Sequence, residues 1–232
     1  MQNHLNKVLD SGNSKDSQRA NLYYDYATSR MLLENLKPEK TDNVLDFGCG
    51  IGRLTNRLKN KINSITGFDI DKEYLALAKK ANPEPNVSFS FKLSALESAT
   101  FNKIFSFWVL CLIDDDDLDV LFKEFYRLLS SKGQVYVFEF VSEKGDVLKD
   151  ASKVKKRLPS FYTELAERHN MIVIQNKSVF RMPSYAMHYW KKHSRLPKFA
   201  LPFLYNLDKA LLFRKPENVL YFTNSYVFRK KQ

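Results

Sequence analysis

The sequence has 232 residues, of which 44% are hydrophobic and 27% are charged, a balance that is typical of a globular chain and excludes a disordered one. No apolar run approaches the length of a membrane span, and the polar first twenty residues lead us to expect no signal peptide. The net charge of +11 fits either a solvated lysine-rich surface or attraction to nucleic acid, anionic lipid or phosphorylated substrates. The two cysteines match no zinc spacing, so we expect a reduced chain in the cytoplasm.

The first 19 residues show no apolar periodicity, and we expect them to form a flexible N-terminal arm. Residues 20–232 are then expected to form a single domain. A helix is predicted over Ala20–Leu36 because its leucines recur at helical spacing and Lys37-Pro38 stops it. Tyr23, Tyr24 and Tyr26 crowd the start of this helix.

The stretch that follows changes from a strand pattern to glycines and then to a helix pattern. Val44-Leu45-Asp46-Phe47 suits a buried parallel strand, whereas Gly48, Gly50 and Gly52 allow close approach to bare backbone. Such a turn before a helix N-terminus is a place where a ligand meets free N–H groups. Asp69 ends a second strand about 20 residues later, the spacing that brings a carboxylate to a ribose diol.

Later segments continue the alternation of strand and helix. In chain order we predict a helix over 72–81 capped by Asp71, a strand over 87–91, a turn with Ser94 and Ala95, a strand over 103–113, a helix opened by Asp114–Asp117 and ended by Ser131–Gly133, a strand over 134–141, a helix over 160–168, and strands over 171–180 and 219–228. The four aspartates are expected to cap the helix rather than bind a metal. This order favours a mostly parallel sheet with helices on both faces and its ligands at the carboxyl ends of the strands.

The motif Asp46-Phe47-Gly48-Cys49-Gly50-Ile51-Gly52 resembles the S-adenosylmethionine loop of class I methyltransferases. The resemblance implies an α/β fold with a Rossmann-like seven-stranded sheet and a helical insertion before the last strand. It also implies S-adenosylmethionine as cofactor and S-adenosylhomocysteine as product; we expect no metal, because the aspartate run is interpreted as a helix cap. By this resemblance the cofactor-binding residues are Asp46, Gly48, Cys49, Gly50, Gly52, Asp69, Ile70, Ser94, Ala95 and Phe107. Ser94 departs from the family pattern, in which an Asp often reaches the adenine amine.

The resemblance implies direct in-line transfer of a methyl group to oxygen or nitrogen of a small-molecule, glycan or lipid-linked acceptor. The sequence identifies no catalytic base; the candidates are Glu139, His188 and Tyr24, while the tyrosines of 20–36 could equally form a packing face. Protein or RNA methylation, or binding of the cofactor without catalysis, are the alternatives. The motifs of nucleic-acid base methyltransferases are missing: Leu110 precedes Cys111, and Phe107-Trp108-Val109-Leu110 follows the fourth strand.

The insertion, about 184–216, is rich in aromatic and basic residues. Its bases include Lys191, Lys192, Arg195, Lys198, Lys209 and Arg214, and its single acid is Asp208. This composition predicts contact with an anionic acceptor or an anionic membrane, or else a helical hairpin packed on the sheet with its lysines in solvent. The oligomeric state stays open.

Overall fold

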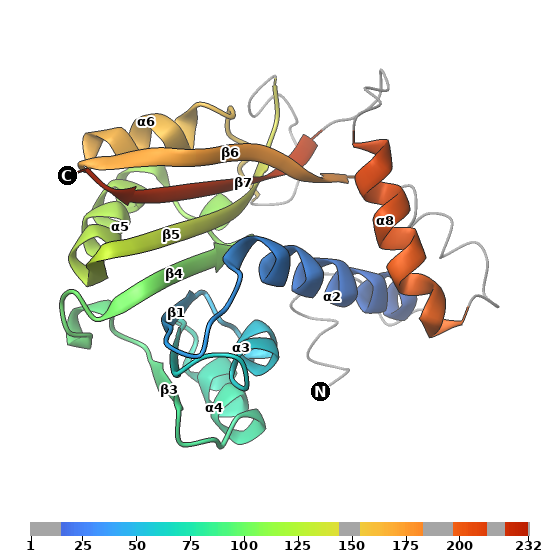
Figure 1. Cartoon of the computed structure of the whole chain (residues 1–232), viewed down its shortest axis with the longest axis horizontal. Coiled ribbons are helices and arrows are strands. Elements are labelled where there is room, and N and C mark those ends of the chain that lie inside the picture. The colour runs from blue at the N-terminus through green and yellow to red at the C-terminus, as the bar shows by residue number, and fades with distance from the viewer. Residues whose placement is uncertain (1–14, 144–153, 183–196, 213–220, 232) are drawn as a thin grey trace.

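The computed structural model describes residues 15–143, 154–182, 197–212 and 221–231 (Figure 1). Most of the predicted arm, the candidate His188 and the outer parts of the predicted insertion lie outside these ranges. None of the helices in the described part of the chain is long and apolar enough to cross a membrane.

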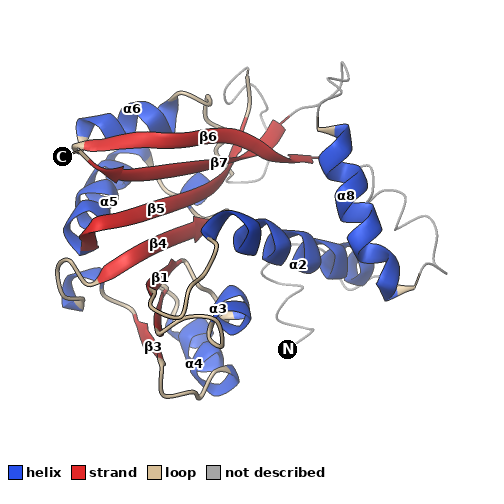
Figure 2. Ribbon diagram, in the orientation of Figure 1, coloured by secondary structure: helices blue, strands red, loops and turns tan. Residues whose placement is uncertain are grey.

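Seven strands form one sheet, which confirms the predicted fold class (Figure 2). The strands are β1 (Asn43–Phe47), β2 (Ser64–Phe68), β3 (Val87–Ser90), β4 (Phe101–Phe107), β5 (Leu129–Val141), β6 (Met171–Met182) and β7 (Tyr221–Lys230). Their order across the sheet is β3-β2-β1-β4-β5-β7-β6. The first five strands pair in parallel, and β7 lies antiparallel between β5 and β6.

Helices cover both faces of the sheet (Figure 2). They are α2 (Lys15–Leu36), α3 (Arg53–Leu58), α4 (Lys72–Ala81), α5 (Asp115–Leu128), α6 (Phe161–Arg168) and α8 (Leu201–Leu211), with short 3-10 turns η1 (Leu93–Ala95), η2 (Leu110–Leu112) and η3 (Lys198–Ala200). Adjacent strand residues point to opposite faces. Val44 and Phe105 therefore pack in the apolar cluster that includes α2, α3 and α8, whereas Leu45 and Ile104 pack in the cluster that includes α5 and α6.

Several predicted boundaries were wrong. Helix α2 begins at Lys15 rather than Ala20. Strand β4 ends at Phe107 rather than at residue 113, because the chain turns into η2. Ser131–Gly133 does not end the preceding helix but lies within β5, where an irregularity in the pairing with β4 absorbs the extra residues.

The aspartate run does open α5, but Asp114 makes no side-chain capping bond. Its carboxylate instead lies 2.5 Å from Lys155 Nζ. Asp115 Oδ1 accepts from Arg157 Nη2 at 2.7 Å. The sequence predicts that these carboxylates accept from backbone N–H groups of the helix. In the structure they pair instead with cationic side chains that are distant in sequence.

The described part of the insertion consists of η3 and α8, and α8 packs on α2. The hydroxyl of Tyr23 donates to the carboxylate of Asp208, and the rings of Tyr26 and Tyr205 meet edge to face at 6.1 Å. Two of the three crowded tyrosines therefore serve this packing. In Figure 1 the arrow of β4 points toward the side of the molecule on which α8 lies.

Candidate functional site

The glycine loop joins β1 to α3 in a conformation that side chains disfavour. Gly48, Gly50 and Gly52 have φ angles of 75°, 52° and 75°, which lie in the left-handed region. The N–H groups of Gly48 and Cys49 donate to the carbonyl of Phe68 at 2.8 and 2.9 Å. These bonds hold the loop against the carboxyl end of β2.

The space around each glycine differs. A Cβ at Gly48 would lie 2.4 Å from a methyl of Val109, and one at Gly52 would lie 2.7 Å from the amide nitrogen of Asn82. A Cβ at Gly50 would meet no atom within 4 Å. The outer two glycines thus allow the loop to pack against protein, whereas the middle one borders open space that a ligand could fill.

Asp69 follows β2 and reaches back to this loop. Its Oδ2 accepts from the N–H of Gly50 at 2.8 Å, and its Oδ1 accepts from the N–H of Asp71 at 2.9 Å. A carboxylate has about four acceptor positions, so both oxygens retain capacity for hydroxyl donors. The next side chain, Ile70, is 83% exposed and is available to a flat apolar ligand.

Asp46, in contrast, is buried within β1. Its Oδ2 accepts from the hydroxyl of Thr55 in α3 at 2.6 Å. Burial raises the pKa of this carboxyl to about 7, although the Thr55 bond and the charge of Arg53 oppose the rise. The structure therefore gives Asp46 the role of tying β1 to α3.

The other predicted binding residues lie along the same edge of the sheet. Ser94 and Ala95 form part of η1 after β3 and are exposed. Phe107 ends β4, with its ring stacked on Phe138 at 4.7 Å. Cys49 is a buried free thiol, and its burial raises its pKa far above the ordinary range. The predicted convergence of strand ends is therefore present in the fold.

Glu139 lies at this edge too, but it is fully buried and already engaged. Its Oε1 accepts from the N–H groups of Val109 and Leu110, both at 2.7 Å, and its Oε2 accepts from that of Cys111 at 3.2 Å. Burial raises its pKa to about 7. The side chain therefore supports the loop after β4, which leaves it poorly placed for the catalytic role considered from sequence.

Arg157 supports the same loop from its carbonyl side, and sequence reasoning missed it. Its guanidinium donates to the carbonyls of Leu110 at 2.9 Å and Ile113 at 2.5 Å, and to the carboxylate of Asp115. Glu139 and Arg157 together satisfy N–H and C=O groups that a buried turn would leave unpaired. A lone arginine in an unassigned segment carries no local signal for this role.

Aromatic side chains lie at the start of the loop that follows β4. The ring of Tyr24 lies 6.1 Å from that of Trp108 in an edge-to-face contact. Trp108 has a φ of 57°, stacks on Phe140 at 4.8 Å, and donates from its indole nitrogen to Thr223 at 3.0 Å. Of the two described candidate catalytic residues, Tyr24 is thus the one whose side chain contacts Trp108 just after β4.

Arg53, at the start of α3, holds α2 in place. Its Nη1 donates to Asp25 and to Thr28, both at 2.9 Å, and Asp25 also pairs with Arg57 at 2.8 Å. Arg53 therefore joins the start of α3 to α2. It also fixes the helix that carries Tyr24 relative to the glycine loop.

Comparison with known proteins finds similarity to methyltransferases. Residues 45–137 match a family described as "Methyltransferase domain". Among curated proteins, phosphoethanolamine N-methyltransferase 3 of Arabidopsis thaliana is 25% identical over 154 residues, which cover 60% of this chain and 30% of that protein. The chain covers between 26% and 53% of the length of the curated relatives that it matches.

Solved structures share the fold. A putative sarcosine dimethylglycine methyltransferase from Galdieria sulphuraria superposes with a TM-score of 0.62 at 18% identity, covering 93% of this chain and 88% of that one. Phosphoethanolamine N-methyltransferase 2 of Haemonchus contortus, solved with S-adenosyl-L-methionine, gives 0.65 at 17% identity, covering 98% and 60%.

Proposed function

Since residues 45–137 match a methyltransferase-domain family and the sheet has the fold of solved methyltransferases, we propose that this chain is a class I S-adenosylmethionine-dependent methyltransferase. The observation that carries the proposal is the open space beside Gly50, next to the carboxylate of Asp69. Bound there, S-adenosylmethionine would supply a methyl group already activated by its sulfonium. We further propose that residues 20–232 act as one domain, because α8 packs in the same apolar cluster as β1.

The residues of this edge suit the proposed ligand. Asp69 retains acceptor positions for two ribose hydroxyls, and Ile70 offers an exposed apolar side chain to the adenine. Asp46 acts through Thr55 on the position of α3, so any hold on the ligand ammonium would be indirect. The full set that we assign to the cofactor is Asp46, Gly48, Cys49, Gly50, Gly52, Asp69, Ile70, Ser94, Ala95 and Phe107.

For the transfer itself the chain has to position the acceptor in line and exclude water. The buried Glu139 keeps the loop after β4 in place, and the rings of Tyr24 and Trp108 contact each other at the start of that loop. Tyr24 is the described hydroxyl that we assign to contact with the acceptor. His188 lies outside the described residues, and its candidacy stays a prediction.

We propose a small molecule as the acceptor, methylated on nitrogen or oxygen, with glycan and lipid-linked acceptors included. The support is that relatives carry names of small-molecule methyltransferases, such as phosphoethanolamine N-methyltransferase. Protein or RNA methylation is the alternative that the basic composition favours. The expected cytoplasmic location stays a prediction.

The test uses the chain with radiolabelled S-adenosylmethionine and a fractionated lysate. We expect calorimetric binding of the methyl donor and label in a small-molecule fraction. Label in protein or RNA would replace the proposed acceptor class. Binding without label in any fraction would favour a non-catalytic binding protein, and no binding at all would overturn the proposed function.

A further inference from the structure

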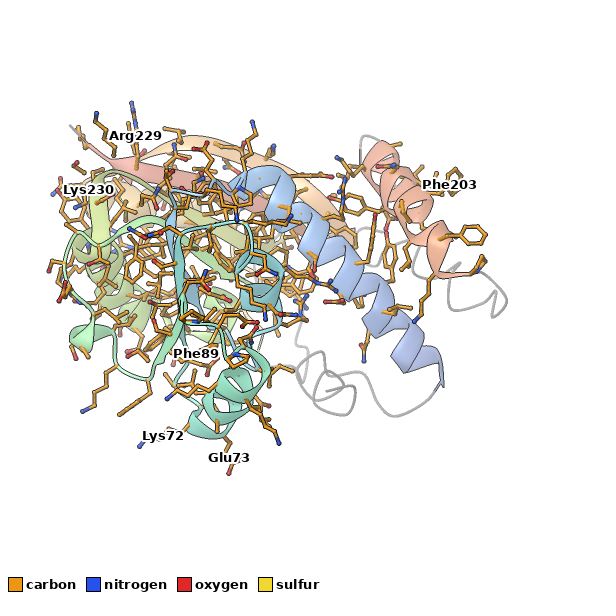
Figure 3. The ribbon with its side chains drawn as sticks, turned by 60° about the horizontal axis from the view of Figure 1, so that its bottom comes forward. Lys72, Glu73, Phe89, Phe203, Arg229 and Lys230 are labelled. Atoms are coloured by element: carbon orange, nitrogen blue, oxygen red, sulfur yellow. The ribbon has the colours of Figure 1, made fainter. Side chains whose placement is uncertain are left out.

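The outer face of α8 and the turn before it is apolar. Phe199, Phe203 and Leu207 recur every fourth residue, so they lie along one side of the helix, and their exposed fractions are 83%, 70% and 39%. Figure 3 shows Phe203 projecting away from the rest of the molecule. Among the described residues, nine large hydrophobic side chains are exposed. Three of these nine lie in the short segment 199–207. Such a concentration marks an interaction surface.

The opposite face of α8 is already in use. Leu201, Leu204 and Tyr205 are buried in the cluster shared with α2, and Lys209 lies 2.9 Å from Glu34 of that helix. Since α8 is fixed by these contacts, its outer face cannot be covered by rotating the helix inward. Within the described ranges, these side chains are left uncovered.

Charge indicates what kind of partner this is. The acid of α8, Asp208, is buried and accepts from Tyr23, so it adds little negative charge to the surface. Lys198 is exposed beside Phe199, and 184–216 carries seven Lys or Arg residues against Asp208 alone. The whole chain has a net charge of +11, so a second copy would be repelled. An anionic surface is the complementary one.

We propose that Phe199, Phe203 and Leu207 form a docking face for an anionic lipid bilayer. Interfacial helices bind in this manner: apolar side chains enter the boundary between headgroups and acyl chains while nearby lysines meet lipid phosphates. The face lies on the helix that packs against α2, whose Tyr24 borders the end of β4. Docking would therefore bring the membrane to the side of the molecule that carries the proposed site. The docking itself does not depend on methyltransferase activity.

The test is co-sedimentation of the full chain with vesicles at low salt. One set contains phosphatidylcholine alone, and the other contains phosphatidylcholine mixed with phosphatidylglycerol. We expect binding to the anionic set, and a loss of roughly tenfold or more in the double variant Phe199→Ser, Phe203→Ser, because two rings no longer leave water. Val120→Ser is the matched control, since Val120 is 60% exposed on α5. It should bind as the wild type does.

Three results would overturn the proposal. The first is no binding to anionic vesicles at low salt, and the second is equal binding by the double variant and the wild type. The third is a dimer in sedimentation velocity that the double variant abolishes, because the face would then join two copies of the chain. Thermal unfolding of each variant, followed by circular dichroism, verifies that the changes act on an intact fold.

Discussion

The buried carboxyl of Glu139 makes the free energy of unfolding depend on pH in a way that Glu139→Gln should remove. Burial raises the pKa of Glu139 from 4.5 to about 7 in the folded chain. A raised carboxyl pKa means that the unfolded chain releases the proton first. The contribution of this group is therefore fully present below pH 4.5 and is lost as the pH rises to about 7. The difference between these two pKa values corresponds to roughly 3 kcal/mol in the free energy of unfolding.

Glutamine keeps most of the contacts without the charge. Its carbonyl oxygen can accept from Val109 and Leu110, whereas its amide group cannot accept from Cys111. The free energy of unfolding of the variant minus that of the wild type should therefore rise by up to roughly 3 kcal/mol as the pH increases from acid to neutral. Glu139→Ala should instead lose about 1–3 kcal/mol for each N–H left unpaired.

Urea unfolding of wild type, Glu139→Gln and the exposed control Glu97→Gln, across about pH 4 to 8, measures this difference. Other titrating groups are shared by all three proteins and cancel in the comparison. A difference between Glu139→Gln and wild type that does not vary with pH would refute the reasoning. It would mean that the three N–H donors keep Glu139 ionised throughout.

The remaining predictions concern the glycine loop and its anchor. Asp69→Ala should weaken binding of S-adenosylmethionine by about 1–3 kcal/mol, the scale of lost charged hydrogen bonds, and calorimetry showing unchanged affinity would contradict its assignment to the ribose. Gly48→Ala should lower the melting temperature because its Cβ would lie 2.4 Å from Val109; adding Val109→Ala should restore part of the loss, and no restoration would argue against the contact. Asp25→Asn should cost about 1 kcal/mol or less in urea unfolding, since it weakens the ion pair with the partly exposed Arg53, and added salt should shrink the effect.

The sequence could predict those parts of the site whose residues lie close together along the chain. The glycine loop and Asp69 fall within one strand–turn–helix–strand unit, so the spacing alone brought them to one edge of the sheet. The mostly parallel sheet followed from the alternation of strands and helices, and its number of strands from the resemblance. Both were confirmed because parallel sheets allow few arrangements of such an alternation.

What could not be predicted depends on contacts between distant residues. Glu139 meets the loop after β4 across 28 to 30 positions, and Arg157 meets it across 44 and 47. The hydrophobic pattern around Glu139 or Arg157 does not predict with which distant backbone groups these side chains form hydrogen bonds. The same limit explains Asp114, whose carboxylate went to Lys155 rather than to the helix that it precedes.

The position of β7 has a consequence for how the protein is made. Tyr221–Lys230 is the last described strand to leave the ribosome, yet it lies between β5 and β6. Until it emerges, β6 lacks the strand with which it pairs in the described sheet, and β5 presents an open edge to other nascent chains. Thr223, which accepts from the indole of Trp108, arrives with it. A translation product stopped before Tyr221 would therefore carry the glycine loop but lack the hydrogen bond between Thr223 and Trp108, and its β5 and β6 would not yet belong to one sheet.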